Sequence, residues 1–230
     1  MAIRLLPFRD YDEHDVVNLF KSAGNLSDFI DLSDAAKRST PQGDAGVFVT
    51  VAGPEGGNLQ GDWDPVDVTS NPASLLGKTD YPHVGRNTYP QAALSVAPTA
   101  GIATESCIGI TLRQTVARDE NGENLLYNPV KKDELFGVLP GEAVPVLSKG
   151  LITLSAEALT IDGQVGQLLE TAADGKAAPI DRGSATNQVI GQILAVGDRD
   201  DNAGSQGGKN VFGNAGFQSG KYYIVKIDCA

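Results

Sequence analysis

Short apolar runs recur along the second half of the chain, and turn residues separate them. In residues 222–227, Tyr223, Val225 and Ile227 fall on one side and Lys226 on the other, the period of two that a half-buried strand needs. Similar runs occupy residues 47–51, 108–112, 143–147, 151–154, 165–169 and 189–196. This spacing is typical of an antiparallel β-barrel or sandwich, so we expect a mainly β fold with this domain in residues 105–230.

Turn residues between these runs predict the connections. Residues 119–123 and 173–175 have the composition of hairpin-type turns. A single short helix is expected between them, because Asn128 followed by Pro129 is a favourable helix start. Gly137 then ends this helix.

Residues 1–42 have a different pattern, with acidic residues packed into positions 10–15. Asp12 can cap a short helix that ends near Gly24. Its apolar stripe at helical spacing consists of Val16, Val17, Leu19 and Phe20. A helix of about ten residues is seldom stable alone in water. We therefore expect an extended N-terminal arm that carries a short helix and lies on its own domain or on a neighbouring subunit.

Residues 43–104 are punctuated by Gly and Pro, and the strand candidate at 47–51 is the clearest element among them. This segment also holds the only tryptophan, Trp63. A structureless loop of such length is unusual inside a compact domain. The segment is therefore expected to be loop-rich, with few strands, and to lie over a partner or over the flank of its own domain.

Charge narrows the classes of function. The chain has 18 Lys and Arg against 29 Asp and Glu, a net charge of −11, which argues against a protein that grips nucleic acid. The uncharged stretch 87–104 contains Pro90 and Pro98 and makes a poor bilayer helix. Two cysteines, Cys107 and Cys229, are too few for a disulfide framework, and we interpret them as small buried hydrophobes in a reducing compartment.

Motifs for catalysis and metal binding are missing or incomplete. The Gly-Lys-Thr at 77–79 lacks the glycine that a phosphate loop needs five residues earlier, where Pro72 stands. His14 and His83 are the only histidines, which leaves little imidazole for a Ser/His/Asp arrangement. The oxygen-rich stretches 119–123 and 198–202 do not match a calcium-binding loop and are interpreted as solvated. We expect no catalytic residues, no cofactor and no metal, hence a protein that is not an enzyme.

Three segments resemble a known group. Residues 6–20, 134–150 and 187–196 are similar to head decoration, or cement, proteins of tailed bacteriophages. The resemblance implies a structural virion protein that is made in the host cytoplasm and lies on the outer capsid surface. As a homotrimer it would bridge neighbouring major capsid subunits, with neither nucleic acid nor membrane as a partner.

The N-terminal arm is the expected contact with the capsid, because its apolar residues would bury surface there and its arginines would meet an acidic capsid surface. The expected partner-binding residues are Arg4, Leu5, Leu6, Phe8, Arg9, Val16, Val17, Leu19 and Phe20. On this hypothesis a truncated chain that begins at Gly43 folds but no longer decorates shells.

Two other classes remain open at this point. The β-domain would instead be a carbohydrate-binding head-fibre or adhesin module if aromatic residues stacked on sugars and the 198–202 loop held calcium. The aromatic residues in question are Trp63, Tyr81, Tyr89, Tyr222 and Tyr223. A hydrolase would need two close carboxylates in a deep pocket, and the sequence does not place such a pair.

Overall fold

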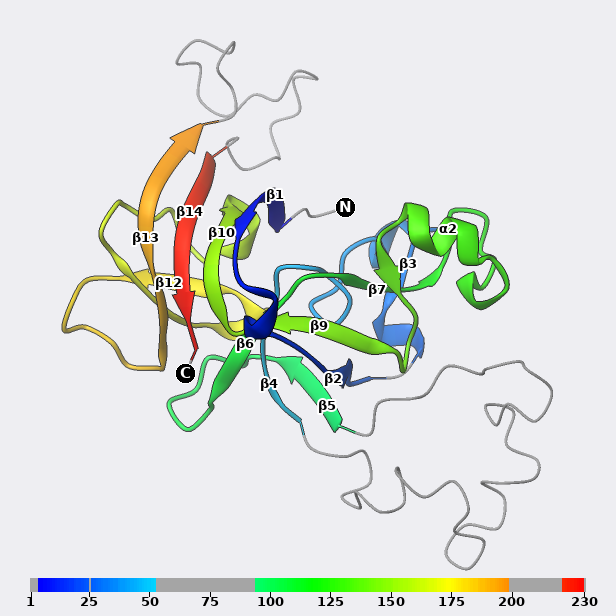
Figure 1. The fold of residues 1–230 in the computed structure, drawn as a ribbon, viewed down its shortest axis with the longest axis horizontal. Helices are drawn as coiled ribbons and strands as arrows, with labels where there is room; N and C mark the ends of the chain where they lie inside the picture. Colours follow the sequence, from blue (N-terminus) through cyan, green and yellow to red (C-terminus); the bar gives the residue numbers. More distant parts are fainter. Residues whose placement is uncertain (1–3, 25, 53–93, 199–220, 230) are drawn as a thin grey trace, which may run out of the picture.

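The computed structural model describes residues 4–24, 26–52, 94–198 and 221–229, and it is mainly β with antiparallel sheets (Figure 1). This confirms the predicted fold class at that level. The strands are β1 (Leu5–Asp10), β2 (Val16–Ser22), β3 (Ile30–Asp31), β4 (Phe48–Val51), β5 (Leu94–Pro98), β6 (Cys107–Thr111), β7 (Gln114–Arg118), β8 (Gly137–Val138), β9 (Ala143–Leu147), β10 (Lys149–Ser155), β11 (Leu168–Thr171), β12 (Ala177–Ile180), β13 (Val189–Asp198) and β14 (Lys221–Asp228).

Helical structure is short. The α-helix α2 spans Pro129–Glu134, and single 3-10 turns are η1 (Glu13–Asp15), η2 (Leu26–Asp28), η3 (Ala35–Lys37), η6 (Leu125–Tyr127), η7 (Ala156–Ala158) and η8 (Ala173–Gly175). Within the described ranges, no helix has both the length and the apolar character required to span a bilayer.

The strands form three sheets. Six of them follow the order β1-β10-β14-β13-β11-β12, and five others close into a barrel in the order β2-β5-β4-β6-β9. A small third sheet has the order β3-β7-β8. The barrel takes strands from both halves of the chain, so it differs from the one expected within residues 105–230, whereas most of the six-stranded sheet does come from that range.

The alternating pattern of residues 222–227 is confirmed in β14. Tyr223, Val225 and Ile227 are fully buried, while Lys226 and Asp228 are exposed. Val225 lies opposite Ile152 of β10 and Ile193 of β13. β14 lies between β10 and β13 in the middle of the sheet (Figure 1), and its apolar face is buried because it packs on the core shared with the barrel.

A single apolar core joins the six-stranded sheet to the barrel. Phe48, Ile110 and Leu147 of the barrel belong to the same buried cluster as Ile152 and Val225 of the sheet. Burial of a large apolar side chain contributes about 2 kcal/mol, so this shared core holds the two sheets together.

The predicted helix near residue 128 is confirmed as α2. The Asn128 side chain accepts a hydrogen bond from the Lys131 amide at 3.3 Å, and Pro129 occupies the first turn. The end differs from the prediction, because Phe136, with φ of 51°, takes the left-handed conformation and Gly137 already begins β8. Figure 1 shows α2 at the opposite side of the molecule from β13 and β14.

Both predicted turns are present. Residues 173–175 form η8 between the antiparallel strands β11 and β12, with Asp174 at φ of 58°. At 119–123 the Asp119 amide donates to the Glu123 carbonyl at 3.0 Å, and an antiparallel bridge between Arg118 and Asn124 closes the turn.

The predicted N-terminal helix is wrong. Asp12 does cap a turn, since its side chain accepts from the His14 amide at 2.9 Å, but only the 3-10 turn η1 follows. Residues 16–22 form β2, which pairs antiparallel with β9 and parallel with β5. The apolar spacing at 16, 17, 19 and 20 fits a strand as well as a helix. A helix of about ten residues is marginally stable, whereas the strand gains hydrogen bonds and side-chain packing from a neighbouring strand on each side.

The prediction of a separate arm also needs correction. β1 is paired with β10 at one edge of the six-stranded sheet, and β2 is a strand of the barrel. A truncation that starts at Gly43 would remove both strands, so the expectation that such a truncated chain folds is not supported by this arrangement.

The prediction for residues 43–104 is tested in part only. The strand expected at 47–51 is present as β4 (Phe48–Val51), and β5 is a second strand in the described part of this segment. Trp63 and the rest of residues 53–93 lie outside the described residues.

Candidate partner-binding groove

The described part of the chain contains a groove of about 760 Å³. It is formed by residues of β1, β2, β8 and β9 and by the residues between β6 and β7. Its lining residues are Leu5, Leu6, Pro7, Arg9, Tyr11, Val16, Asn18, Leu112, Arg113, Phe136, Val138, Ala143 and Pro145. Most of them are apolar, and strands distant in sequence bring them together.

The charge of the groove is opposite to that of the whole protein. It is lined by Arg9 and Arg113 and by no carboxylate, although the chain has a net charge of −11. Both arginines are exposed, and no ion pair of the described residues involves either of them. Two guanidinium groups with no ion-pair partner among the described residues, in an apolar setting, favour an acidic ligand.

An exposed aromatic residue lies at the groove. Phe136 is 74% exposed and has φ of 51°, a conformation that costs a residue other than glycine about 1 kcal/mol or more. The Phe136 amide ends α2 by donating to the Asp133 carbonyl at 3.0 Å, but most of the residue is exposed to solvent. We interpret Phe136 as a contact for a partner, because aromatic residues are enriched at interfaces.

The irregular course of β1 shapes the groove. Its pairing with β10 shifts register between Leu5 and Arg9, and Pro7 lies in the shifted stretch. The Arg9 side chain donates from Nε to the Leu6 carbonyl at 3.1 Å, which holds its guanidinium beside the strand. Leu5 and Leu6 are buried and form the floor.

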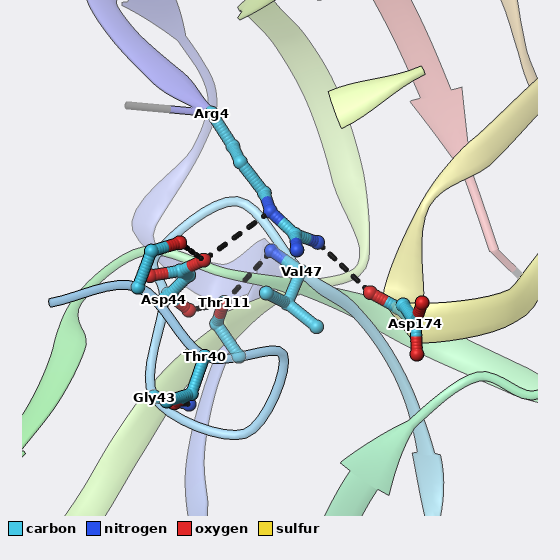
Figure 2. A network of polar contacts seen from close by, with 8 residues as sticks. Arg4, Thr40, Gly43, Asp44, Val47, Thr111 and Asp174 are labelled. Atoms are coloured by element: carbon cyan, nitrogen blue, oxygen red, sulfur yellow. Dashed lines mark hydrogen bonds and ion pairs between the residues drawn. The ribbon is translucent and has the colours of Figure 1, made fainter. Parts of the chain in front are cut away.

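Arg4 fixes the start of β1 (Figure 2). Its Nη1 donates to the Asp174 carbonyl at 2.9 Å, and its Nε lies 3.4 Å from Oδ2 of Asp44. Asp44 also accepts a hydrogen bond from the Ser39 hydroxyl at 2.7 Å. The Thr111 hydroxyl donates to the Asp44 carbonyl and accepts from the Val47 amide. This network ties the N-terminal segment to the barrel and to the η8 turn.

Burial governs the electrostatics of this pair. It lowers the pKa of the Arg4 guanidinium and raises the pKa of the Asp44 carboxyl, and in each case the charge of the other residue opposes the effect. Burial of this ion pair therefore costs desolvation free energy. Loss of one partner costs more, because the remaining charge would be buried without an opposite charge beside it.

The predicted partner-binding residues divide into groups. Leu5, Leu6, Arg9 and Val16 do line the groove. Arg4, expected at the tip of an arm, is instead buried, and it borders a smaller adjoining hollow of about 170 Å³.

The other four predicted residues lie outside the groove lining. Phe8 is 60% exposed on β1, and Val17 and Leu19 are exposed on β2. Phe20 turns inward, where it packs on Val49 and Val146 inside the barrel. Four of the nine predicted residues thus line the groove and five do not, and their contact with a capsid stays a prediction.

The other side of the groove was missed, chiefly Tyr11, Arg113 and Phe136. Arg113 follows directly after the apolar run 108–112, where a charged residue is an ordinary strand end, so the sequence has no signal for it. Phe136 precedes the glycine expected to end a helix, and only its positive φ marks it as unusual.

Residues 6–20 and 134–150 meet at this groove. Residues 6–20 contain most of β1 and most of β2, and residues 134–150 contain β8 and β9. β2 pairs with β9, with Val16 opposite Leu147. Both segments contribute lining residues, including Leu6, Val16, Phe136 and Pro145.

The residues named for sugar binding are less favourably placed. Tyr223 is fully buried, and its hydroxyl donates to Oδ1 of Asp162 at 3.1 Å, so its ring cannot stack on a sugar. Tyr222 is half-buried beside Gly197. Trp63, Tyr81 and Tyr89 lie outside the described residues, as do residues 199–202 of the acidic loop.

Within the ranges that the structure covers, no three His, Cys, Asp or Glu side chains gather as a metal site would require. Comparisons of the chain with protein-family models, with curated proteins and with solved structures gave no match.

Proposed function

We propose that this protein is a structural virion protein that decorates an icosahedral phage capsid and stabilises it by bridging neighbouring major capsid subunits. The single observation that carries this proposal is the acid-free apolar groove with two arginines outside any ion pair of the described residues, in a protein of net charge −11. Most of its lining residues, though not Leu5, Leu112 and Arg113, come from the segments that resemble cement proteins, and this agreement supports the same function.

The groove accepts an extended acidic and apolar segment of the major capsid protein. Arg9 and Arg113 bind its carboxylates, and Phe136 packs on its apolar side chains. Pro7 lacks an amide hydrogen and interrupts the exposed edge of β1, so side-chain contacts rather than a continuous β-ladder hold the segment.

The finer architecture belongs to this proposal. The six-stranded sheet, drawn mainly from residues after 105, is the sandwich-like body, and the barrel is the layer on which it packs. The body displays the groove toward the outer capsid surface. The protein acts as a homotrimer, so each trimer presents several grooves and bridges several capsid subunits. Many weak contacts across one lattice then add through multivalency.

Co-sedimentation with capsids tests this function. The full-length chain is mixed with undecorated shells of the phage that encodes it, and its molar mass in solution is measured by light scattering. We expect a trimer that pellets with shells in a saturable manner. A chain that stays in the supernatant at saturating shell concentrations would contradict the proposal, and glycan-dependent binding would favour the adhesin alternative.

A further inference from the structure

The two cysteines of the chain lie against each other. Cys107, at the start of β6, and Cys229, directly after β14, are 122 positions apart in sequence, yet their Sγ atoms are 3.9 Å apart. Both residues are buried, at 0% and 7% exposure. A buried residue touches about 6 to 12 others, so in a chain of 230 residues two given positions are in contact by chance about once in 20 to 40 cases.

The local backbone holds the two cysteines in this position. The Gln188 side chain accepts from the Cys107 amide and donates to the Cys107 carbonyl. The Cys229 amide donates to the Ser148 carbonyl at 3.0 Å. One thiol thus belongs to a strand of the barrel and the other follows a strand of the six-stranded sheet, and both are part of the shared core.

We propose that Cys107 and Cys229 are a disulfide-forming pair that locks the barrel to the six-stranded sheet when the protein meets an oxidising thiol environment. Disulfide sulfurs are about 2 Å apart, so side-chain rotation and a small backbone shift suffice to close the gap. This inference is independent of the proposed capsid function, because it rests on the two thiols alone.

The oxidant is a low-molecular-weight disulfide. One cysteine thiolate attacks a sulfur of the reagent and forms a mixed disulfide, while the first reagent thiolate leaves and takes up a proton. The other cysteine thiolate then attacks the protein sulfur of the mixed disulfide and displaces the second reagent thiolate. The protein loses two electrons and two protons, and the reagent becomes two thiols.

Burial makes this reaction slow in the folded protein. The Cys107 thiol and burial raise the pKa of the Cys229 thiol, and thiolate rather than thiol is the nucleophile. Of the two residues, Cys229 is the more exposed, so we expect the mixed disulfide to form there first, during a local opening of the end of β14.

The test uses the wild-type chain in reduced and oxidised forms. Reduced protein is incubated with oxidised glutathione under native conditions and, in a second sample, during refolding from urea. We expect the intact mass of the monomer to fall by two hydrogen atoms, with a linked peptide pair containing residues 107 and 229. The oxidised form should melt about 5 to 10 °C above the reduced form.

Cys107→Ala and Cys229→Ala are the matched controls, and each should fail to gain stability on oxidation. If either variant does not fold, peptide mapping of the wild type still decides the question. Two free thiols after refolding with the oxidant, stable glutathione adducts on both cysteines, or links between chains instead of within one would overturn the proposal.

Discussion

The buried ion pair of Arg4 and Asp44 shows how single residues position the groove. Arg4 stands next to Leu5 and Leu6, which form the groove floor. It also reaches the η8 turn through the Asp174 carbonyl. A polar residue thus holds the first strand in register with the rest of the molecule.

Removal of either partner should therefore destabilise the protein. We expect Arg4→Met and Asp44→Leu each to lower the free energy of unfolding by about 3 kcal/mol, because the remaining charge is left buried without its partner. The double variant should lose much less than the sum of the two losses, since it buries neither charge. Urea denaturation of the wild type, the two single variants and the double variant measures the coupling free energy between the two residues. A loss in the double variant equal to the sum of the two single losses would contradict this expectation.

At the scale of elements, β6 and β9 approach so closely that only glycine fits between them. A Cβ atom at Gly109 in β6 would lie 2.3 Å from the Leu147 carbonyl oxygen of β9, the neighbouring strand of the barrel. This contact matters for the groove because β9 supplies Ala143 and Pro145 to its wall.

Gly109→Ala should separate these strands. Gly166→Ala is the control, because Gly166 also has a positive φ but a Cβ atom added there would have nothing within 4 Å. We expect the control to cost about 1 kcal/mol in backbone strain, and Gly109→Ala to cost about 2 kcal/mol more from the collision. Equal losses in thermal or urea unfolding would show that the close approach is not essential.

The loop before β11 is tied to the start of β14 by Asp162. Its carboxylate accepts hydrogen bonds from Lys221 and from the Tyr223 hydroxyl, and the bond from Lys221 is the main reason that the pKa of Asp162 is lowered from 3.8. A lowered pKa in the folded state stabilises the protein above pH 3.8, and this contribution is lost as the pH falls through the folded-state value.

Asp162→Asn should therefore destabilise the protein near neutral pH, and the difference from wild type should shrink below pH 3.8. Urea unfolding at a series of pH values checks this expectation. If the difference in unfolding free energy between wild type and Asp162→Asn stays constant down to the most acidic pH, the carboxylate charge contributes nothing to stability.

Local patterns predicted some elements well and others poorly. The alternation in β14 and the Asn128-Pro129 start of α2 are local signals, and both predictions are confirmed. Residues 16–22 have a spacing that suits helix and strand alike, and only their pairing with β9 and β5 decides between them. Of the groove lining, Leu5, Leu6, Arg9 and Val16 were among the predicted contact residues, whereas Arg113 and Phe136 reach the groove through long-range packing that no local pattern indicates.

At the scale of the whole molecule, the distribution of charge is the feature most relevant to function. The described groove concentrates positive charge and apolar surface in a protein that is otherwise acidic. Such a contrast guides an acidic partner to one face and disfavours binding elsewhere. The strands that carry the groove also complete the sheet and the barrel, so under the proposed function binding and folding would depend on the same N-terminal residues.

Charge reversal at the groove tests the central claim most directly. Arg113→Glu is compared with Arg182→Glu, which makes the same change at another exposed arginine, located after β12 at the opposite edge of the six-stranded sheet from β1. Both variants must retain the wild-type melting temperature. In co-sedimentation with undecorated shells, we predict that Arg113→Glu weakens binding about tenfold or more, about 1.4 kcal/mol, while Arg182→Glu binds like wild type. Equal binding by the two variants would contradict the claim that the groove is the capsid contact.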